Sequence, residues 1–80
     1  MEFEVVMPRM GSEMTEGSVA RWLKNEGDQV EKGELLMEIE TTKAVVAVES
    51  MVNGVLKKII VDDPEEVIPV GQLIGVIETS

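Results

Sequence analysis

One lysine in this 80-residue chain is a candidate for chemistry, because the usual reactive side chains are missing around it. Lys43 lies in the stretch 41–44 (Thr-Thr-Lys-Ala), between two runs rich in alternating apolar residues. The chain contains no histidine and no cysteine, which supply many catalytic bases, nucleophiles and transition-metal ligands. A catalytic triad is therefore excluded, and catalysis by the chain alone would depend on carboxylates, lysine or hydroxyl groups.

If Lys43 takes part in chemistry, we expect it to be modified by another enzyme and not to act as a catalyst. An exposed lysine is protonated at neutral pH and is a poor nucleophile, and nothing near it in the sequence would desolvate it. Schiff-base catalysis by Lys43 is therefore not expected. Two interpretations remain open from the spacing alone: a solubilising charge on a hairpin, or an amine that another enzyme acylates so that the attached group does the work.

Composition and charge restrict the partners. Sixteen acidic residues against seven basic ones give a formal net charge of −9, which argues against binding nucleic acid or an anionic membrane. The chain is 44% apolar but has one Trp, one Phe and no Tyr, so we expect a core of Val, Ile, Leu and Met. The absence of cysteine fits a reducing compartment, and we expect the cytoplasm.

The elements that would position Lys43 are strands. Period-two alternation and β-branched residues dominate, and no stretch of ten residues has a helical period. In the run before the lysine, alternation places Leu35, Met37 and Ile39 on one face. The expected strands cover residues 3–6, 18–24, 35–41, 44–50, 54–61 and 73–78. The chain is therefore predicted to be all-β.

The turn that carries Lys43 lacks Gly, Asn and Asp. Two-residue type I′ and II′ hairpin turns need positive φ angles and are disfavoured there, whereas a type I turn tolerates Thr and Lys. We therefore predict a defined turn with Lys43 pointing into solvent.

The chain also contains an internal repeat, in which residues 17–41 are similar to residues 54–79. Two strand–turn–strand units are too few for a solenoid, so the repeat predicts two halves facing each other across one core, related by a pseudo-twofold axis. That symmetry would place the lysine turn at one end of the molecule and both termini at the other. The equivalent pairs are Gly17/Gly54, Val19/Leu56, Leu23/Ile60, Val30/Val67, Gly33/Gly71, Leu35/Leu73, Ile39/Ile77, Glu40/Glu78 and Thr41/Thr79.

The lysine turn, the strands and the repeat occur together in one known family. The run VMPRMGSEMTEGSVARWLKNEGDQVEKGELLMEIETTKA resembles the lipoyl domains of dihydrolipoamide acyltransferases, components of 2-oxoacid dehydrogenase complexes. Glycines sixteen residues before and eleven after the family's modified lysine correspond to Gly27 and Gly54, for which turn geometry is the expected role. The resemblance implies a flattened β-barrel of two four-stranded antiparallel sheets with pseudo-twofold symmetry. It also implies a single domain over residues 1–80, forming the N-terminal part of a longer acyltransferase chain.

The resemblance further implies a carrier with no catalytic residues or metal of its own. Lys43 would hold lipoic acid through an amide bond made by a lipoate–protein ligase. The arm would visit a thiamine-diphosphate-dependent 2-oxoacid decarboxylase, the acyltransferase core and dihydrolipoyl dehydrogenase. The isolated domain would be a monomer that binds neither nucleic acid nor membrane.

Partner enzymes of such a carrier would read the residues around the lysine. In the family, the loop after the first strand lies near the lysine turn. Thr42 stands where the family usually has Asp, and Ala47 stands where an acidic residue is common, which puts the choice of decarboxylase in doubt more than lipoyl attachment. The candidate recognition residues are Thr42 and Ala44 in the turn, and Arg9, Met10, Gly11, Ser12, Glu13, Met14 and Thr15 in the loop.

Other functional classes fit parts of the same sequence. A biotinyl domain shares the fold, but its lysine normally lies between two methionines, and Thr42 and Ala44 are neither. An unmodified acidic interaction module of the same fold would leave Lys43 free and bind a partner through its carboxylates. The acidic run at 62–66 lacks the alternating ligand spacing and glycine of an EF-hand, so a solvated turn explains it better than calcium binding.

Overall fold

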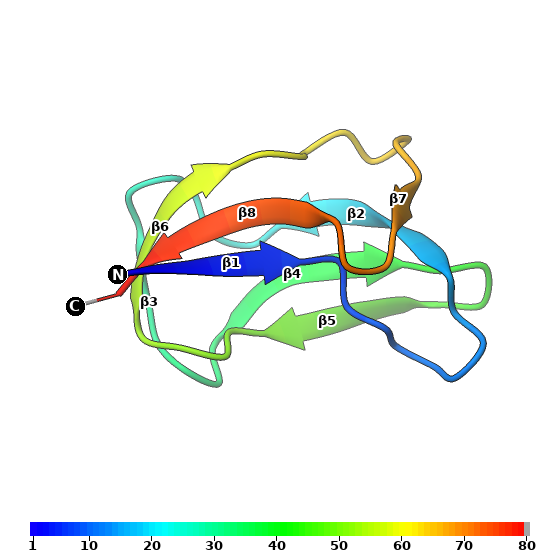
Figure 1. Ribbon diagram of the computed structural model, residues 1–80, viewed down its shortest axis with the longest axis horizontal. Helices are drawn as coiled ribbons and strands as arrows, with labels where there is room; N and C mark the ends of the chain where they lie inside the picture. Colours follow the sequence, from blue (N-terminus) through cyan, green and yellow to red (C-terminus); the bar gives the residue numbers. More distant parts are fainter. Residues whose placement is uncertain (80) are drawn as a thin grey trace.

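The computed structural model describes residues 1–79 as strands joined by turns and loops (Figure 1). The expected all-β architecture is confirmed: eight strands form two four-stranded sheets in which every pairing is antiparallel. No helix in this described part of the chain could span a bilayer. The strands are β1 (Glu2–Val6), β2 (Glu16–Trp22), β3 (Gln29–Val30), β4 (Leu35–Glu40), β5 (Val45–Glu49), β6 (Gly54–Ile59), β7 (Ile68–Pro69) and β8 (Leu73–Glu78).

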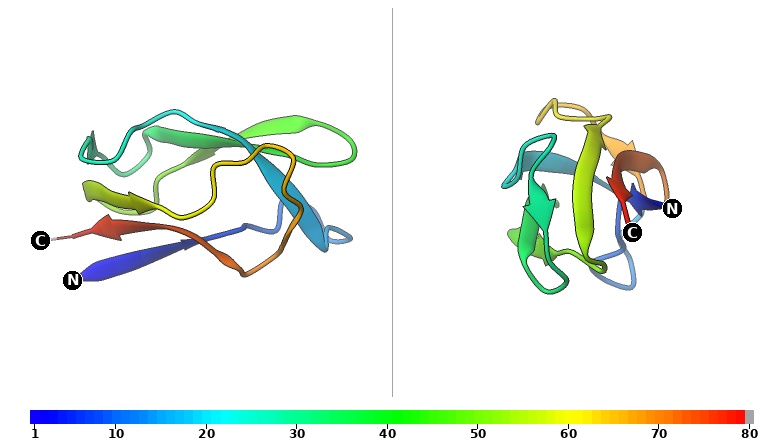
Figure 2. Two further views of the ribbon diagram at one scale, coloured as in Figure 1. Left: turned by 90° about the horizontal axis from the view of Figure 1, so that it is seen from above. Right: turned by 90° about the vertical axis from the view of Figure 1, so that its left-hand side faces the viewer.

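The two sheets enclose one aliphatic core. One sheet has the strand order β1-β8-β6-β3 and the other β5-β4-β2-β7, and the molecule measures 35 × 22 × 18 Å (Figure 2). As the composition predicted, the buried apolar side chains of the described residues are all Val, Ile, Leu or Met, and burial of apolar surface drives folding. Phe3 and Trp22 pack against this core while partly exposed. The buried apolar residues are Val5, Met7, Val19, Val30, Leu36, Met37, Ile39, Leu56, Val61, Ile68, Ile74 and Ile77.

The two halves are related by the predicted pseudo-twofold symmetry, with one correction. Gly17 lies opposite Ile68 where β2 meets β7, and Gly54 lies opposite Val30 where β6 meets β3. The predicted equivalence of Val30 with Val67 is therefore wrong. Val30 and Ile68 are both fully buried, whereas Val67 is 57% exposed. The extra residue of the second half lies before β7, in the loop after β6, because a loop accommodates an insertion without moving a core side chain.

A β-bulge in β4 changes which side chains face the core. The pairing of β4 with β5 shifts register between Leu35 and Met37, and a bulge of this kind breaks the period-two alternation. Leu36 and Met37 are both buried, while Leu35 is 48% exposed. The predicted shared face of Leu35, Met37 and Ile39 is therefore wrong for Leu35.

The six expected strands are present, one of them (73–78) with the predicted bounds and the other five with shifted ends, and two short strands were not predicted. β3 and β7 contain two residues each, which is too short for a visible period. Pro69 also lowers the strand propensity of β7. These two strands nevertheless complete each sheet at its edge, because tertiary pairing, and not local propensity, creates them.

The two glycines that match the family pattern have different roles. Gly27 has φ of +94° and lies in a turn, as predicted, because only glycine adopts this conformation freely. Gly54 begins β6 and was predicted wrongly as a turn glycine. A Cβ atom there would lie 2.3 Å from the carbonyl oxygen of Glu78 and 2.8 Å from a methyl group of Ile77. Gly54 is therefore required for the close approach of β6 and β8.

Candidate functional site

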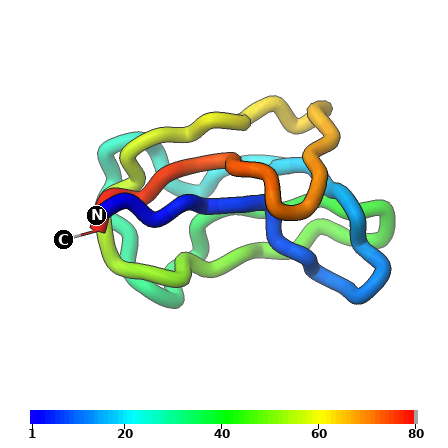
Figure 3. The backbone as a smooth tube through the Cα atoms, in the orientation of Figure 1, coloured from blue at the N-terminus to red at the C-terminus, as the bar shows by residue number. Residues whose placement is uncertain are grey.

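Lys43 lies on the turn between β4 and β5, at the end of the molecule remote from both termini. Figures 1 and 3 show this turn, drawn in green, at one end of the long axis, with the two chain ends at the other. The antiparallel pairing continues up to Glu40 and Val45, so the turn is held by a regular ladder on both sides. The lysine turn and the termini thus lie at opposite ends, as the internal repeat predicted.

The hydroxyl group of Thr41 organises the turn. Its oxygen accepts hydrogen bonds from the backbone N–H groups of Lys43 and Ala44, both at 3.2 Å, and the hydroxyl donates to the carbonyl of Ala44 at 3.1 Å. The backbone N–H of Thr41 donates to the same carbonyl at 2.8 Å. In a type I turn, the backbone N–H of Ala44 would donate to the backbone carbonyl of Thr41. Here it donates to the side-chain oxygen of Thr41 instead. The prediction of a defined turn is confirmed, but a side chain closes it.

The lysine turn has no residue with a positive φ angle, as the sequence predicted. Among residues 1–79, only glycines have positive φ angles, so the type I′ and II′ hairpin turns are excluded at Lys43. Thr42, Lys43 and Ala44 are all exposed, and Thr41 is half-buried. Threonine often bonds to its own local backbone in turns, and this preference is the sequence signal that could have indicated Thr41.

The same closure recurs at the chain ends, where the symmetry places Thr79 and Met1. Thr79 donates to the carbonyl of Met1 through its backbone N–H at 2.7 Å and through its hydroxyl at 3.0 Å. Figure 2 shows the two chain ends lying together. The two hydrogen bonds from a threonine to one carbonyl therefore occur in both halves of the repeat. In the first half the chain continues through residues 42 and 43, and this turn carries the lysine.

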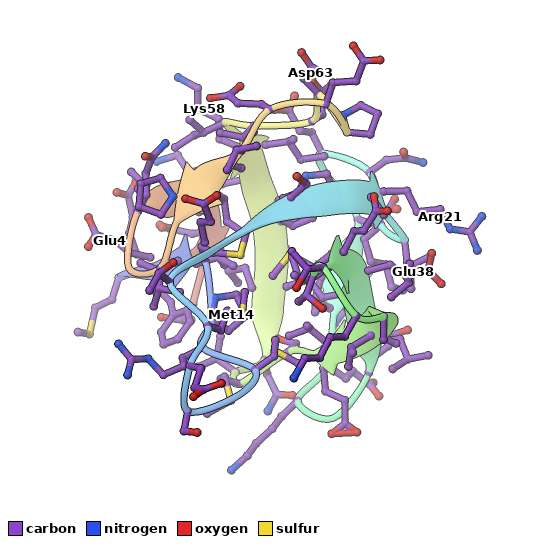
Figure 4. The ribbon with its side chains drawn as sticks, turned by 90° about the vertical axis from the view of Figure 1, so that its right-hand side faces the viewer. Glu4, Met14, Arg21, Glu38, Lys58 and Asp63 are labelled. Atoms are coloured by element: carbon purple, nitrogen blue, oxygen red, sulfur yellow. The ribbon has the colours of Figure 1, made fainter. Side chains whose placement is uncertain are left out.

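Lys43 is electrostatically unpaired within the described part of the chain. The ion pairs among the described residues do not include Lys43. They join Arg21 to Glu38 at 2.8 Å, Lys24 to Glu34 at 2.6 Å, Lys57 to Glu2, and the N-terminus to Glu78 at 4.0 Å. Figure 4 labels Arg21 and Glu38 close together. Within the described residues, no carboxylate therefore holds the Lys43 side chain against the protein surface.

The structure brings the loop after β1 beside the lysine turn. Residues 10–16 and 41–44, together with Val46, line one open hollow at this end of the molecule. Figures 2 and 3 show the two segments projecting at the same end. Six of the seven loop candidates, Met10 to Thr15, border the hollow, and Arg9 does not. Sequence reasoning missed three residues of this surface: Glu16, Thr41 and Val46.

Met14 fixes the loop to the barrel. Its sulfur accepts a hydrogen bond from the backbone N–H of Met10 at 3.1 Å, and its side chain packs against the core cluster. Figure 4 looks onto this end of the molecule and labels Met14 on the loop, toward the lysine turn. A Cβ atom on Gly17 would lie 2.9 Å from the terminal methyl of Met14. Met14 thus forms part of the floor of the hollow, while its neighbours in the loop form the rim.

The site fits a covalently attached carboxylic acid. A primary amine on a closed turn, exposed and without an ion pair in the described residues, can form an amide without any rearrangement of the fold. The described residues contain no group of three or more His, Cys, Asp or Glu side chains arranged to hold a metal ion.

Comparison with known proteins agrees with this geometry. Residues 3–77 match the biotin–lipoyl family model, described as a biotin-requiring enzyme. The chain is 46% identical over 77 residues to the dihydrolipoyllysine-residue acetyltransferase component of pyruvate dehydrogenase complex from Rickettsia conorii, covering 96% of this chain and 19% of that protein. It is 48% identical over 73 residues to the mitochondrial acetyltransferase component 2 from Arabidopsis thaliana, covering 91% of this chain and 14% of the relative.

The fold comparison gives the same result. The structure matches the lipoyl domain of the 2-oxoglutarate dehydrogenase complex from Azotobacter vinelandii with a TM-score of 0.76 and 29% identity, covering 95% of both chains. The chain spans about a fifth of the length of the Rickettsia relative, 19%. From the match over residues 3–77 and this shared fold, we conclude that the chain belongs to the biotin–lipoyl family, as a domain of the lipoyl type.

Proposed function

We propose that the chain is a swinging-arm acyl carrier whose lipoyl group is attached to Lys43. The observation that carries the proposal is the position of Lys43 on a hydroxyl-closed turn, at the end of the barrel remote from the termini. When bound, lipoic acid supplies a disulfide that can accept an acyl group and two electrons. The similarity to lipoyl domains supports this assignment.

The barrel contributes presentation and reach. Lys43 projects from a paired β-hairpin, so the arm would move while its base stays fixed. Attachment of the domain at the opposite end, where both termini lie, would leave the turn open to several active sites in succession. Tethering makes each encounter effectively intramolecular, so a weak affinity for each partner is sufficient.

The proposed partners are the enzymes of a 2-oxoacid dehydrogenase complex. They are a thiamine-diphosphate-dependent decarboxylase, an acyltransferase core and dihydrolipoyl dehydrogenase, with a lipoate–protein ligase acting first. Support comes from relatives that are named as components of pyruvate dehydrogenase complex and are several times longer than this chain. We accordingly propose that these residues act as one domain of a longer acyltransferase component.

The Lys43 amine supplies the nucleophile for attachment. Once deprotonated, the Lys43 Nζ would attack the carbonyl carbon of the ATP-activated lipoyl carboxyl. An amide forms, the activating nucleotide leaves with the bonding electron pair, and the amine proton passes to solvent. The open hollow between the turn and residues 10–16 gives the attaching enzyme access from one side of the turn.

The testing experiment is intact mass after incubation with lipoate, ATP and a lipoate–protein ligase. We expect one lipoyl increment on the wild-type chain and none on Lys43→Arg. Lys32→Arg is the matched control, because Lys32 is also an exposed lysine in a turn and should leave the increment unchanged. An increment that persists in Lys43→Arg would contradict the attachment site.

The same experiment separates the alternatives. Incubation with biotin, ATP and a biotin–protein ligase should leave the mass unchanged, because Thr42 and Ala44 replace the methionines typical of a biotinyl lysine. A biotin increment without a lipoyl increment would assign the chain to the biotin branch of the family. A folded wild-type chain that accepts neither group would favour an unmodified interaction module.

A further inference from the structure

We propose that Thr41 is a positioning residue for Lys43: its hydroxyl holds the lysine turn in the one shape that the attaching enzyme recognises. This inference rests on the proposed function, because it concerns how Lys43 is presented for lipoyl attachment. Thr41 itself would touch neither the incoming acyl group nor the attaching enzyme's catalytic groups. Its effect would be transmitted through the backbone of Lys43 and Ala44.

The hydrogen bonds place Thr41 in control of the turn. Two successive N–H groups, of Lys43 and Ala44, share its oxygen as acceptor, and no other protein acceptor is recorded for them in the described structure. Both residues are exposed, so their N–H groups can also bond to water. A turn closed by one hydroxyl loses several contacts together when that hydroxyl is removed, because each depends on the same atom.

The pseudo-twofold symmetry supplies an internal reference at Thr79. Its hydroxyl donates to the Met1 carbonyl at 3.0 Å, as that of Thr41 donates to the Ala44 carbonyl at 3.1 Å. The contact common to both copies therefore belongs to the fold. Among the described residues, Thr41 also accepts hydrogen bonds from Lys43 and Ala44, and Thr79 has no equivalent of these two bonds. A comparison of variants at Thr41 and Thr79 can therefore distinguish a positioning role from a purely structural one.

Removal of the hydroxyl should lower the fraction of molecules with a competent turn. Thr41→Val keeps the β-branched shape and the backbone bond from residue 41 to Ala44, so the hairpin should persist. The N–H groups of Lys43 and Ala44 would then turn to water, and the turn would sample other shapes. Since only the competent fraction binds productively, the apparent affinity falls by that fraction. The change should appear in KM more than in kcat.

The test is the kinetics of lipoyl attachment, followed by intact mass with lipoate, ATP and a lipoate–protein ligase. We expect Thr41→Val to lower kcat/KM about tenfold, as loss of one or two ordinary hydrogen bonds would, with the loss in KM. Thr41→Ser keeps the hydroxyl and should restore the wild-type rate to within about threefold. Thr79→Val is the matched control: it removes only the hydroxyl contact that the two copies share, and it should leave attachment unchanged.

A second measurement requires no variant. Amide hydrogen exchange of the unmodified wild-type chain should show Lys43 and Ala44 protected, although both are exposed. Exchange of both amides at the rate of an unstructured peptide would overturn the inference, even if Thr41→Val failed to fold. Equal attachment rates for Thr41→Val and wild type, or a Thr41→Ser variant as slow as Thr41→Val, would also overturn it.

Failure of the proposed function has a different signature. If the wild-type chain gains no lipoyl increment, the carrier assignment itself is wrong, whatever the amide exchange shows. If the wild type is modified at Lys43 but is indifferent to the Thr41 hydroxyl, the carrier assignment stands and only the positioning role is removed.

Discussion

Gly54 and Glu78 approach each other so closely that no side chain fits between them. A Cβ atom on Gly54 would lie 2.3 Å from the Glu78 carbonyl oxygen, a backbone atom that cannot move without disturbing β8. The symmetry-related glycine, Gly17, is less restricted. Its Cβ would lie 2.9 Å from the flexible methyl end of Met14 and 3.2 Å from the Glu40 carbonyl oxygen.

The first prediction follows from this contrast. Gly54→Ala should destabilise the domain by about 2–3 kcal/mol, the usual cost of forcing extra volume into a packed site. Gly17→Ala should cost about 1 kcal/mol or less, because a methionine side chain can rotate away. Urea unfolding of both variants measures the difference. Equal losses would contradict the assignment of Gly54 as the rigid contact.

The second prediction concerns the loop anchored by Met14. Met14→Ala should destabilise the domain by about 1–2 kcal/mol, because a half-buried side chain leaves a partial cavity. It should also slow reductive acylation by a partner decarboxylase more than lipoyl attachment at Lys43. Met14→Leu retains most of the volume and is the control, with a cost below about 1.5 kcal/mol. Equal slowing of the two reactions by Met14→Ala would argue against a recognition role for the loop.

The third prediction concerns Thr42, where the family usually has an acidic residue. Thr42 is exposed on the rim of the hollow, so Thr42→Asp should fold normally. A unit charge at contact distance in water is worth about 1 kcal/mol and less with salt. We expect Thr42→Asp to change the rate of reductive acylation by a conventional decarboxylase more than the rate of lipoyl attachment. Parallel kinetic assays of both steps measure this, and equal effects would refute it.

The fourth prediction concerns pH. The hydrogen bond from Lys24 lowers the pKa of Glu34 below its ordinary value, and the N–H of Glu31 reinforces the effect. A lowered carboxyl pKa in the folded state adds stability above the unfolded pKa of 4.5. That stability is lost as pH falls through the folded value. Unfolding free energies measured from about pH 6 to pH 3 should therefore decrease more in the wild type than in Glu34→Gln.

The control for that titration is Glu65→Gln, because Glu65 belongs to none of the four ion pairs in the described residues. It should retain the wild-type dependence on acid. The effect at Glu34 should be small, since surface ion pairs contribute little and salt screens them. A Glu34→Gln variant with the same acid dependence as the wild type would mean that the ion pair does not persist in solution.

The sequence determined by itself those features that depend on local periodicity and composition. Alternating β-branched residues define six of the eight strands, and the lack of aromatic residues requires an aliphatic core. The repeat predicts the symmetry, and the symmetry places Lys43 and the termini at opposite ends. Composition, side-chain spacing within a segment and similarity between segments are displayed directly by a sequence, without knowledge of which segments meet in space.

The tertiary structure decided what depends on two segments meeting. β3 and β7 exist because partner strands from the other half pair with them, and the bulge at Leu36 became visible only in the register with β5. The role of Gly54 depends on the backbone of Glu78, and the hollow beside Lys43 depends on a loop distant in sequence. Such contacts require the relative positions of chain segments, which folding sets and local pattern does not encode.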